Sequence, residues 1–123
     1  MAKILIADDE RTLVNIIRIN LEIEGFEVDS VYDGQEALEM IEKSNYDLLI
    51  LDVMMPNLSG ISLATKLRKD PQKKSIPIIF LTAKVQETDI KAGLSVGDKY
   101  ITKPFEPQFL AKEVKTLLRQ KKG

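Results

Sequence analysis

Five short segments of strand length alternate along the chain with five longer segments of helical periodicity. The central short segment, Leu48–Leu51, is aliphatic at every position, which is typical of a strand buried on both faces of a sheet. Strict alternation of strands and helices predicts an α/β fold with a parallel sheet. The five predicted strands cover residues 3–7, 26–31, 48–51, 78–81 and 99–102.

The helical segments carry recognisable start and stop signals. Gly25 is a stop for the first helix, and Asp33 with Glu36 forms a capping box at the start of the second. Right-handed crossovers favour a doubly wound, flavodoxin-like sheet of five strands in the order 2-1-3-4-5, flanked by five helices. The remaining helices are predicted to begin near Ser59 and to span Glu87–Leu94 and Glu106–Gln120.

Polar residues directly follow four of the predicted strands. Ligands of open parallel sheets bind at the carboxyl ends of the strands, and the order 2-1-3-4-5 makes the first and third strands neighbours. We therefore expect Asp8, Asp9 and Asp52 to lie together. The polar residues are Asp8 and Asp9 after the first strand, Asp52 after the third, Thr82 after the fourth and Lys103 after the fifth.

Three neighbouring carboxylates favour a bound cation, because like charges held close together raise the cost of ionisation. The chain has no histidine and no cysteine, so the predicted ion is one that prefers oxygen ligands, Mg²⁺. An alternative is open for Asp8 and Asp9, which on their own would serve equally well to cap the following helix. Asp52 at the neighbouring strand favours the metal site.

Lys103 and Thr82 add a cation and a hydroxyl donor, both of which can bind the oxygens of a phosphoryl group. Each has an ordinary alternative, since strand-end lysines usually face solvent and threonines are common in turns. A carboxylate nucleophile, a metal site, a cation and a hydroxyl donor together indicate phosphoryl transfer onto Asp52.

The composition narrows the class of protein. The 123 residues suit one domain, and the 44% hydrophobic and 30% charged content is that of a soluble globular protein. The net charge of -1 gives no indication of binding to nucleic acid or to an anionic membrane. No apolar segment reaches the ~20 residues of a membrane span, so the predicted compartment is the cytoplasm.

Several motifs occur in the order and spacing of a known family. Together they resemble bacterial response-regulator receiver domains of the CheY-like kind, from Lys3 to about Arg119. The resemblance implies one receiver domain over residues 1–123, acting in two-component signal transduction. The motifs that carry it are Asp8–Glu10, Leu51–Pro56, Gly60, Leu81–Ala83 and Tyr100–Phe105.

The resemblance implies a role for each acidic residue. Asp52 would be the phosphoacceptor and would also bind Mg²⁺ directly, as would Asp9. Asp8 would bind the ion mostly through water, and the backbone carbonyl of Met54 would complete the protein ligands.

The resemblance also implies how phosphorylation is read. Thr82 and Lys103 would hold the phosphoryl oxygens, and Tyr100 corresponds to the aromatic residue of the switch. The Lys103–Pro104 peptide bond is expected to be cis, an isomer that is rare outside X-Pro bonds.

The implied phosphodonor is a sensor histidine kinase or a phosphotransfer protein. The receiver would supply the catalytic groups for its own phosphorylation and autodephosphorylation, so we expect a switch and no enzyme that turns over a small molecule. Phosphorylation is expected to change the face formed by the fourth helix, the last strand and the fifth helix. This face would control a downstream effector, an output domain or a phosphorylation-dependent homodimer, without direct contact with membrane or nucleic acid.

One segment departs from the family pattern. Relatives often read Gly-Ala-Asp-Asp-Tyr before the final motif, whereas this chain reads Gly97-Asp98-Lys99-Tyr100, one residue fewer if Gly97 matches the family glycine. The shortening affects the path from the fourth helix into the last strand and spares the active-site residues.

Two other functions fit parts of the pattern. A metal-dependent phosphohydrolase also forms an aspartyl phosphate, but many such enzymes carry an aspartate two residues after the nucleophile, where this chain has Met54. A pure interaction module would not need Asp9, Asp52, Thr82 and Lys103 together. Neither G-x-G-x-x-G nor the P-loop pattern occurs, which disfavours nucleotide binding.

Overall fold

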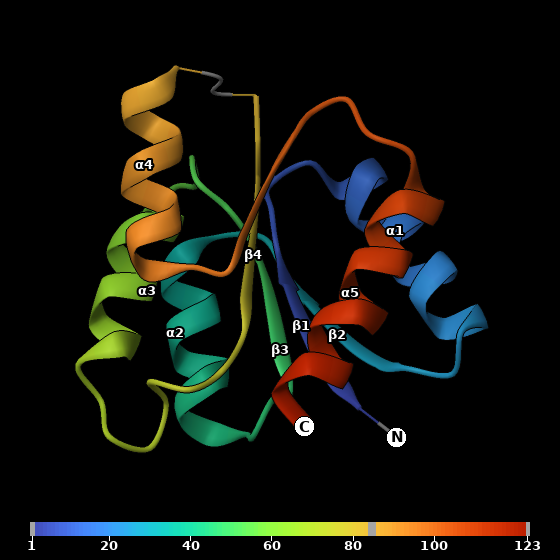
Figure 1. The fold of residues 1–123 in the computed structure, drawn as a ribbon, viewed down its shortest axis with the longest axis horizontal. Helices are drawn as coiled ribbons and strands as arrows, with labels where there is room; N and C mark the ends of the chain where they lie inside the picture. Colours follow the sequence, from blue (N-terminus) through green and yellow to red (C-terminus); the bar gives the residue numbers. More distant parts are fainter. Residues whose placement is uncertain (1, 84–85, 123) are drawn as a thin grey trace.

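The computed structural model describes residues 2–83 and 86–122, in which five strands alternate with five helices, as the sequence predicts (Figure 1). The strands are β1 (Lys3–Ala7), β2 (Glu27–Val31), β3 (Leu48–Asp52), β4 (Ile78–Thr82) and β5 (Lys99–Thr102). The helices are α1 (Arg11–Ile23), α2 (Gly34–Lys43), α3 (Gly60–Arg68), α4 (Glu87–Val96) and α5 (Pro107–Lys122). Within these residues, no helix has the length and apolar character needed to cross a membrane.

The five strands form one parallel sheet in the order β2-β1-β3-β4-β5. Helices α1 and α5 cover one face of the sheet, and α2, α3 and α4 cover the other (Figure 1). The predicted doubly wound order is therefore confirmed. It makes β1 and β3 neighbours at the position where the chain reverses its direction across the sheet, which is where such folds bind ligands.

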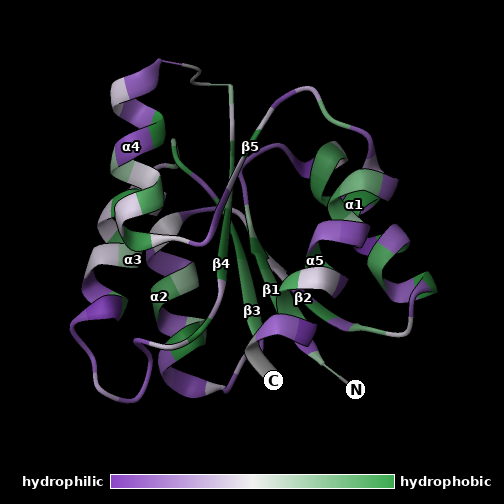
Figure 2. Cartoon of the chain, viewed as in Figure 1, coloured by the Kyte–Doolittle hydropathy of each residue, from purple (hydrophilic) through white to green (hydrophobic). Residues whose placement is uncertain are grey.

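The central strands supply the core on both faces of the sheet, and they form the apolar centre of the molecule in Figure 2. Ile50 points into a cluster that packs against Val114 of α5, while Leu49 points into a second cluster that packs against Leu63 of α3. Successive side chains of a strand alternate between faces, so an all-aliphatic strand serves both cores. Burial of each such side chain contributes ~1.5–3 kcal/mol to the stability of the fold. The buried strands therefore hold in place the polar residues at their ends.

Helix α1 ends at the predicted glycine in a Schellman motif. Gly25 has a φ of 95°, its N–H donates to the carbonyl of Glu22, and the N–H of Phe26 donates to the carbonyl of Leu21. Phe26 packs in the same apolar cluster as Leu21 and belongs to this helix end. Strand β2 therefore begins at Glu27, one residue later than predicted.

Asp33 caps α2 as predicted, accepting a hydrogen bond from the backbone N–H of Glu36 at 2.8 Å. The Glu36 carboxylate accepts from the backbone N–H of Tyr32 at 3.2 Å, one residue before the position that a standard capping box uses. Gly34 follows the cap, and a β-carbon there would lie 1.9 Å from the carbonyl oxygen of Leu58. The start of α2 is thus held directly against the loop that follows β3.

Helix α4 reaches Val96, past its predicted end at Leu94, and only Gly97 and Asp98 join it to β5. The N–H of Gly97 donates to the carbonyl of Gly93 at 2.8 Å. The N–H of Asp98 donates to the carbonyl of Ile78, the first residue of β4, also at 2.8 Å. The segment in which the sequence departs from the family pattern is therefore a tight, hydrogen-bonded connection. The observed ends of α5 also differ from the predicted ones by one or two residues.

Candidate functional site

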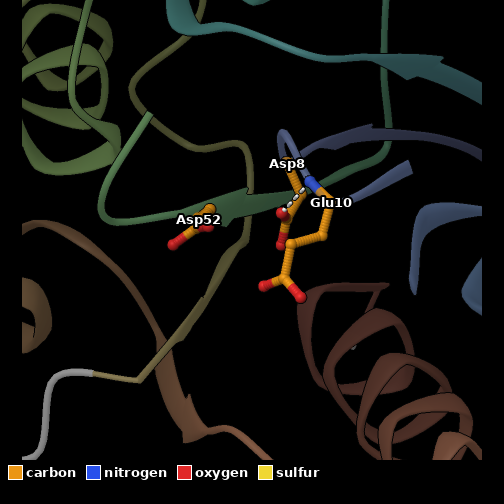
Figure 3. A group of neighbouring side chains, drawn as sticks. All are labelled: Asp8, Glu10 and Asp52. Atoms are coloured by element: carbon orange, nitrogen blue, oxygen red, sulfur yellow. Dashed lines mark hydrogen bonds between the residues drawn. The ribbon is translucent and has the colours of Figure 1, made fainter. Parts of the chain in front are cut away.

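Asp8 and Asp52 lie side by side at the carboxyl edge of the sheet. Strands β1 and β3 pair with Ala7 opposite Leu51, so the residues that come next are neighbours. Asp8 is fully buried and Asp52 is 5% exposed. Figure 3 shows Asp8 on the loop after β1, together with Glu10, and Asp52 at the end of β3.

The third carboxylate of this cluster is Glu10. Among the described residues, Asp8, Glu10 and Asp52 each offer a carboxylate oxygen within 4.8 Å of the others. Asp9, which the sequence predicted in this place, is exposed and lines a neighbouring groove of about 600 Å³ with Met54. The structure thus brings two of the three predicted carboxylates together and places Asp9 at the adjoining groove.

The ammonium group of Lys103 lies among these carboxylates. Lys103 follows β5, and its peptide bond with Pro104 is cis, as predicted. The Nζ atom is 2.9 Å from Asp8 Oδ2 and 3.2 Å from Asp52 Oδ2. The same atom also contacts the carboxylate of Glu10. One positive charge is therefore shared by three negative ones.

The charges at this edge perturb one another's ionisation. Burial raises the pKa of the Asp52 carboxyl to about 6, and the negative charge of Asp8 acts in the same direction. The Lys103 ammonium opposes this rise only in part. Burial lowers the pKa of Lys103, but its contacts with Glu10 and Asp8 and the charge of Asp52 outweigh burial, so that pKa is raised overall.

The donor set of the cluster suits a hard divalent cation. Asp8 Oδ2 is buried and faces the Lys103 ammonium. The other acceptor oxygens come from Asp52 and Glu10, and ions such as Mg²⁺ prefer oxygen ligands. The backbone N–H of Met54 donates to Asp52 Oδ1 at 3.1 Å and so orients this carboxylate. These residues fit a metal ion.

The helix-capping alternative for Asp8 is not the observed arrangement. The N-cap position of α1 is Glu10, whose side chain makes no capping hydrogen bond. Asp8 Oδ1 accepts from the backbone N–H of Glu10 at 2.9 Å, which ties the loop to the buried carboxylate. No role of its own was predicted for Glu10 from the sequence. Glutamate is a poor N-cap residue, and its place just before α1 was the one sign in the sequence that its side chain serves another purpose.

Thr82 and Tyr100 lie on neighbouring strands beside this cluster. Thr82 ends β4 and is 1% exposed, while Tyr100 in β5 is half-buried. Burial raises the pKa of Tyr100, as do the charges of Asp89 and Asp52, and a side-chain hydrogen bond with Thr82 acts in the opposite direction. The two residues that the sequence assigned to the switch are therefore in direct contact.

The comparisons with known proteins agree with this geometry. The sequence model of the response regulator receiver domain matches residues 4–115. The chain is 45% identical to the alkaline phosphatase synthesis transcriptional regulatory protein PhoP of Bacillus subtilis (strain 168), over 96% of this chain and 49% of that protein. It spans about half the length of the curated relatives that it matches.

Solved structures share the fold over almost the full chain. A CheY-like receiver domain protein of Methanospirillum hungatei superposes with a TM-score of 0.93 at 28% identity, covering 99% of this chain and 97% of the other. The response regulator TrrA of Thermotoga maritima, solved in complex with Mg(2+)-BeF, has a TM-score of 0.84 at 38% identity, covering 95% and 99%. This chain therefore belongs to the response regulator receiver domain family of two-component signal transduction.

Proposed function

We propose that Asp52 is the phosphoacceptor of this receiver domain, and that a sensor histidine kinase or a phosphotransfer protein is the donor. An oxygen of the Asp52 carboxylate forms a bond to phosphorus while the bond from phosphorus to the donor atom breaks. The donor leaves with the electron pair, and the protein carries an aspartyl phosphate. The chemistry is limited to accepting this group and losing it again by hydrolysis.

The observation that carries this proposal is the position of Lys103. Its ammonium lies 3.2 Å from Asp52 Oδ2 and 2.9 Å from the buried Asp8, although the three residues come from three different strand ends. A lysine held at this point neutralises charge on a transferred phosphoryl group. We expect Thr82, which is buried at the next strand end, to donate to another phosphoryl oxygen.

Asp8, Asp9, Asp52 and the backbone carbonyl of Met54 would hold the metal ion, which we propose to be Mg²⁺. When bound, Mg²⁺ neutralises negative charge on the phosphoryl oxygens. Support comes from the buried carboxylate of Asp8 beside that of Asp52, and from the groove shared by Asp9 and Met54. The related TrrA was solved with Mg(2+)-BeF.

A phosphohydrolase is less well supported at this site. Such an enzyme needs a general acid near the leaving group, and the residue two positions after Asp52 is Met54, which has no titratable group. The described acidic side chains that cluster within 4.8 Å of the Asp52 carboxylate are Asp8 and Glu10, and both pair with Lys103. They suit charge balance around a phosphoryl group better than proton donation.

We further propose that phosphorylation is transmitted through Thr82 and Tyr100 to the face formed by α4, β5 and α5. The contact between these residues supports this route. Because the chain spans about half of its curated relatives, the controlled partner is proposed to be an output domain, a separate effector or a second phosphorylated copy. The relatives PhoP and VanR are named as regulatory proteins, which favours control of transcription.

Intact-mass spectrometry tests the acceptor. Native protein incubated with acetyl phosphate and Mg²⁺ should gain one phosphoryl group, and Asp52→Asn should gain none. Omission of Mg²⁺ should prevent labelling of native protein. Equal labelling of both proteins would show that the acceptor lies elsewhere.

A further inference from the structure

Glu10 occupies the accessible side of the Lys103 ammonium. The side chain of Glu10 is 58% exposed, whereas those of Asp8 and Asp52 are 0% and 6% exposed. The two aspartates therefore hold the ammonium from the inside of the site, and Glu10 holds it from the solvent side. An incoming phosphodonor approaches from solvent, so Glu10 is the first of the three carboxylates that it meets.

The backbone around Glu10 directs this side chain toward the site. Glu10 has an extended backbone (φ -84°, ψ 91°), its N–H donates to Asp8 Oδ1, and its carboxylate does not cap α1. Instead, the carboxylate reaches a lysine that is 93 residues away in the sequence. The Lys103 contact thus takes the place of the local capping bond that an N-cap side chain normally makes.

We propose that Glu10 is a positioning residue that competes with the phosphoryl group for Lys103, an inference that rests on the proposed phosphorylation of Asp52. In the unphosphorylated protein, the Glu10 carboxylate holds the ammonium at the mouth of the site. A phosphoryl group on Asp52 needs the same ammonium and carries negative charge, so Lys103 must release Glu10 when the group arrives. Glu10 therefore opposes the entry and retention of anions at the site.

The test compares Glu10→Gln with native protein at a saturating Mg²⁺ concentration. Acetyl phosphate is the phosphodonor, and its bond from phosphorus to acetate breaks as Asp52 attacks. Intact-mass spectrometry follows the labelling over time and gives the second-order rate constant. We expect Glu10→Gln to react about two- to fivefold faster, the size of one partly exposed charge interaction. It should also bind beryllofluoride more tightly by a similar factor.

Two features separate this role from a structural one. Charge interactions at an exposed site are screened by salt, so the difference between Glu10→Gln and native protein should shrink at 1 M NaCl. Glu39→Gln on α2 removes the same charge from another exposed position and should leave the rate constant unchanged. Melting temperatures confirm that both variants are folded.

The outcomes also separate Glu10 from a metal ligand. Isothermal calorimetry with Mg²⁺ alone should give similar dissociation constants for native protein and Glu10→Gln, and a loss of about tenfold or more would overturn the proposal in favour of ligation. Unchanged rate and beryllofluoride affinity in Glu10→Gln would overturn it as well. If native protein is not labelled at all while beryllofluoride binding still responds to Glu10→Gln, the proposed function fails and the competition for Lys103 stands.

Discussion

Gly93 of α4 lies directly against the ring of Tyr100 in β5: a β-carbon on Gly93 would be 2.7 Å from the nearest ring carbon. The ring of Tyr100 is also 6.4 Å from that of Phe80, centroid to centroid, at an angle of 53°. The absence of a side chain at Gly93 thus makes room for the tyrosine between α4 and the sheet. Helix α4 and the proposed switch residue are coupled by this contact.

We predict that Gly93→Ala destabilises the protein, although alanine is the better helix former by about 1 kcal/mol. The new methyl group would overlap the Tyr100 ring and force either the ring or α4 to move, which typically costs about 1–3 kcal/mol. Urea unfolding followed by circular dichroism should show the loss. In a Tyr100→Ala background the same substitution should be neutral or stabilising, and an equal loss in both backgrounds would contradict the proposed contact.

The raised pKa of Asp52 predicts how stability depends on pH in the absence of metal. Its folded-state pKa of about 6 lies above the ordinary value of 3.8, so the native state binds more protons than the unfolded state between these values. The free energy of unfolding attributable to Asp52 should therefore fall as pH rises from about 4 to about 6, by at most about 3 kcal/mol. Asp52→Asn should lack this fall and melt at a higher temperature in EDTA at pH 7.

Mg²⁺ should reduce this difference in melting temperature between wild type and Asp52→Asn. Binding to the native state stabilises a protein by mass action, so wild type should gain more melting temperature from Mg²⁺ than Asp52→Asn does. Thermal unfolding across pH 4–8, with EDTA or with Mg²⁺, measures both effects. Parallel pH profiles for the two proteins in EDTA would show that Asp52 is not the group responsible.

Lys103→Met should destabilise the metal-free protein more than an ordinary surface lysine substitution does. The Lys103 side chain is 13% exposed, and its removal leaves buried Asp8 and Asp52 without their cation. Loss of one partner from a largely buried ion pair typically costs about 3–5 kcal/mol. Urea unfolding in EDTA should show a loss of this order, whereas Lys91→Met, at a side chain that is 76% exposed, should change stability little.

Mg²⁺ provides the matching control for Lys103. An added cation should restore more stability to Lys103→Met than to wild type, because the ion then replaces the missing positive charge beside Asp8. A variant that remains equally destabilised with and without Mg²⁺ would indicate that the lysine acts through packing.

The sheet order and the meeting of Asp8 with Asp52 could be predicted from sequence because they follow from topology. Apolar strand segments, alternating with helices, leave one favoured order, and that order makes the ends of β1 and β3 adjacent. The cis bond before Pro104 was predicted from the family resemblance alone. These features depend on local pattern and on rules that hold for the whole fold class.

The role of Glu10 could not be predicted in the same way. Its contact with Lys103 depends on the path of two side chains that meet from distant strand ends, which hydrophobic periodicity does not encode. The short connection after α4 is a second example. Arg68 donates to the carbonyl of Val96 at 2.7 Å and pairs with Asp98 at 3.4 Å, so a partly buried guanidinium from α3 fixes the loop. Such long-range polar contacts leave no periodic signal in the sequence.

The last prediction concerns the relay from Asp52 to the α4–β5–α5 face. Thr82 is buried and already contacts Tyr100, so a phosphoryl group that recruits the Thr82 hydroxyl must change this hydrogen bond. Tyr100 in turn packs against Gly93, which carries the change into α4. Two packings of this segment would then be biased by one modification.

Beryllofluoride with Mg²⁺, a mimic of the aspartyl phosphate, allows the relay to be followed by backbone chemical shifts. We expect large shift changes at Thr82, Gly93 and Tyr100 in native protein. Thr82→Ala should bind the mimic while showing smaller changes at Gly93 and Tyr100, because the hydroxyl that links the site to the tyrosine is gone. Shift changes confined to residues that touch Asp52, in native protein as well as in the variant, would mean that Tyr100 is a fixed strand aromatic and that the signal leaves the site by another path.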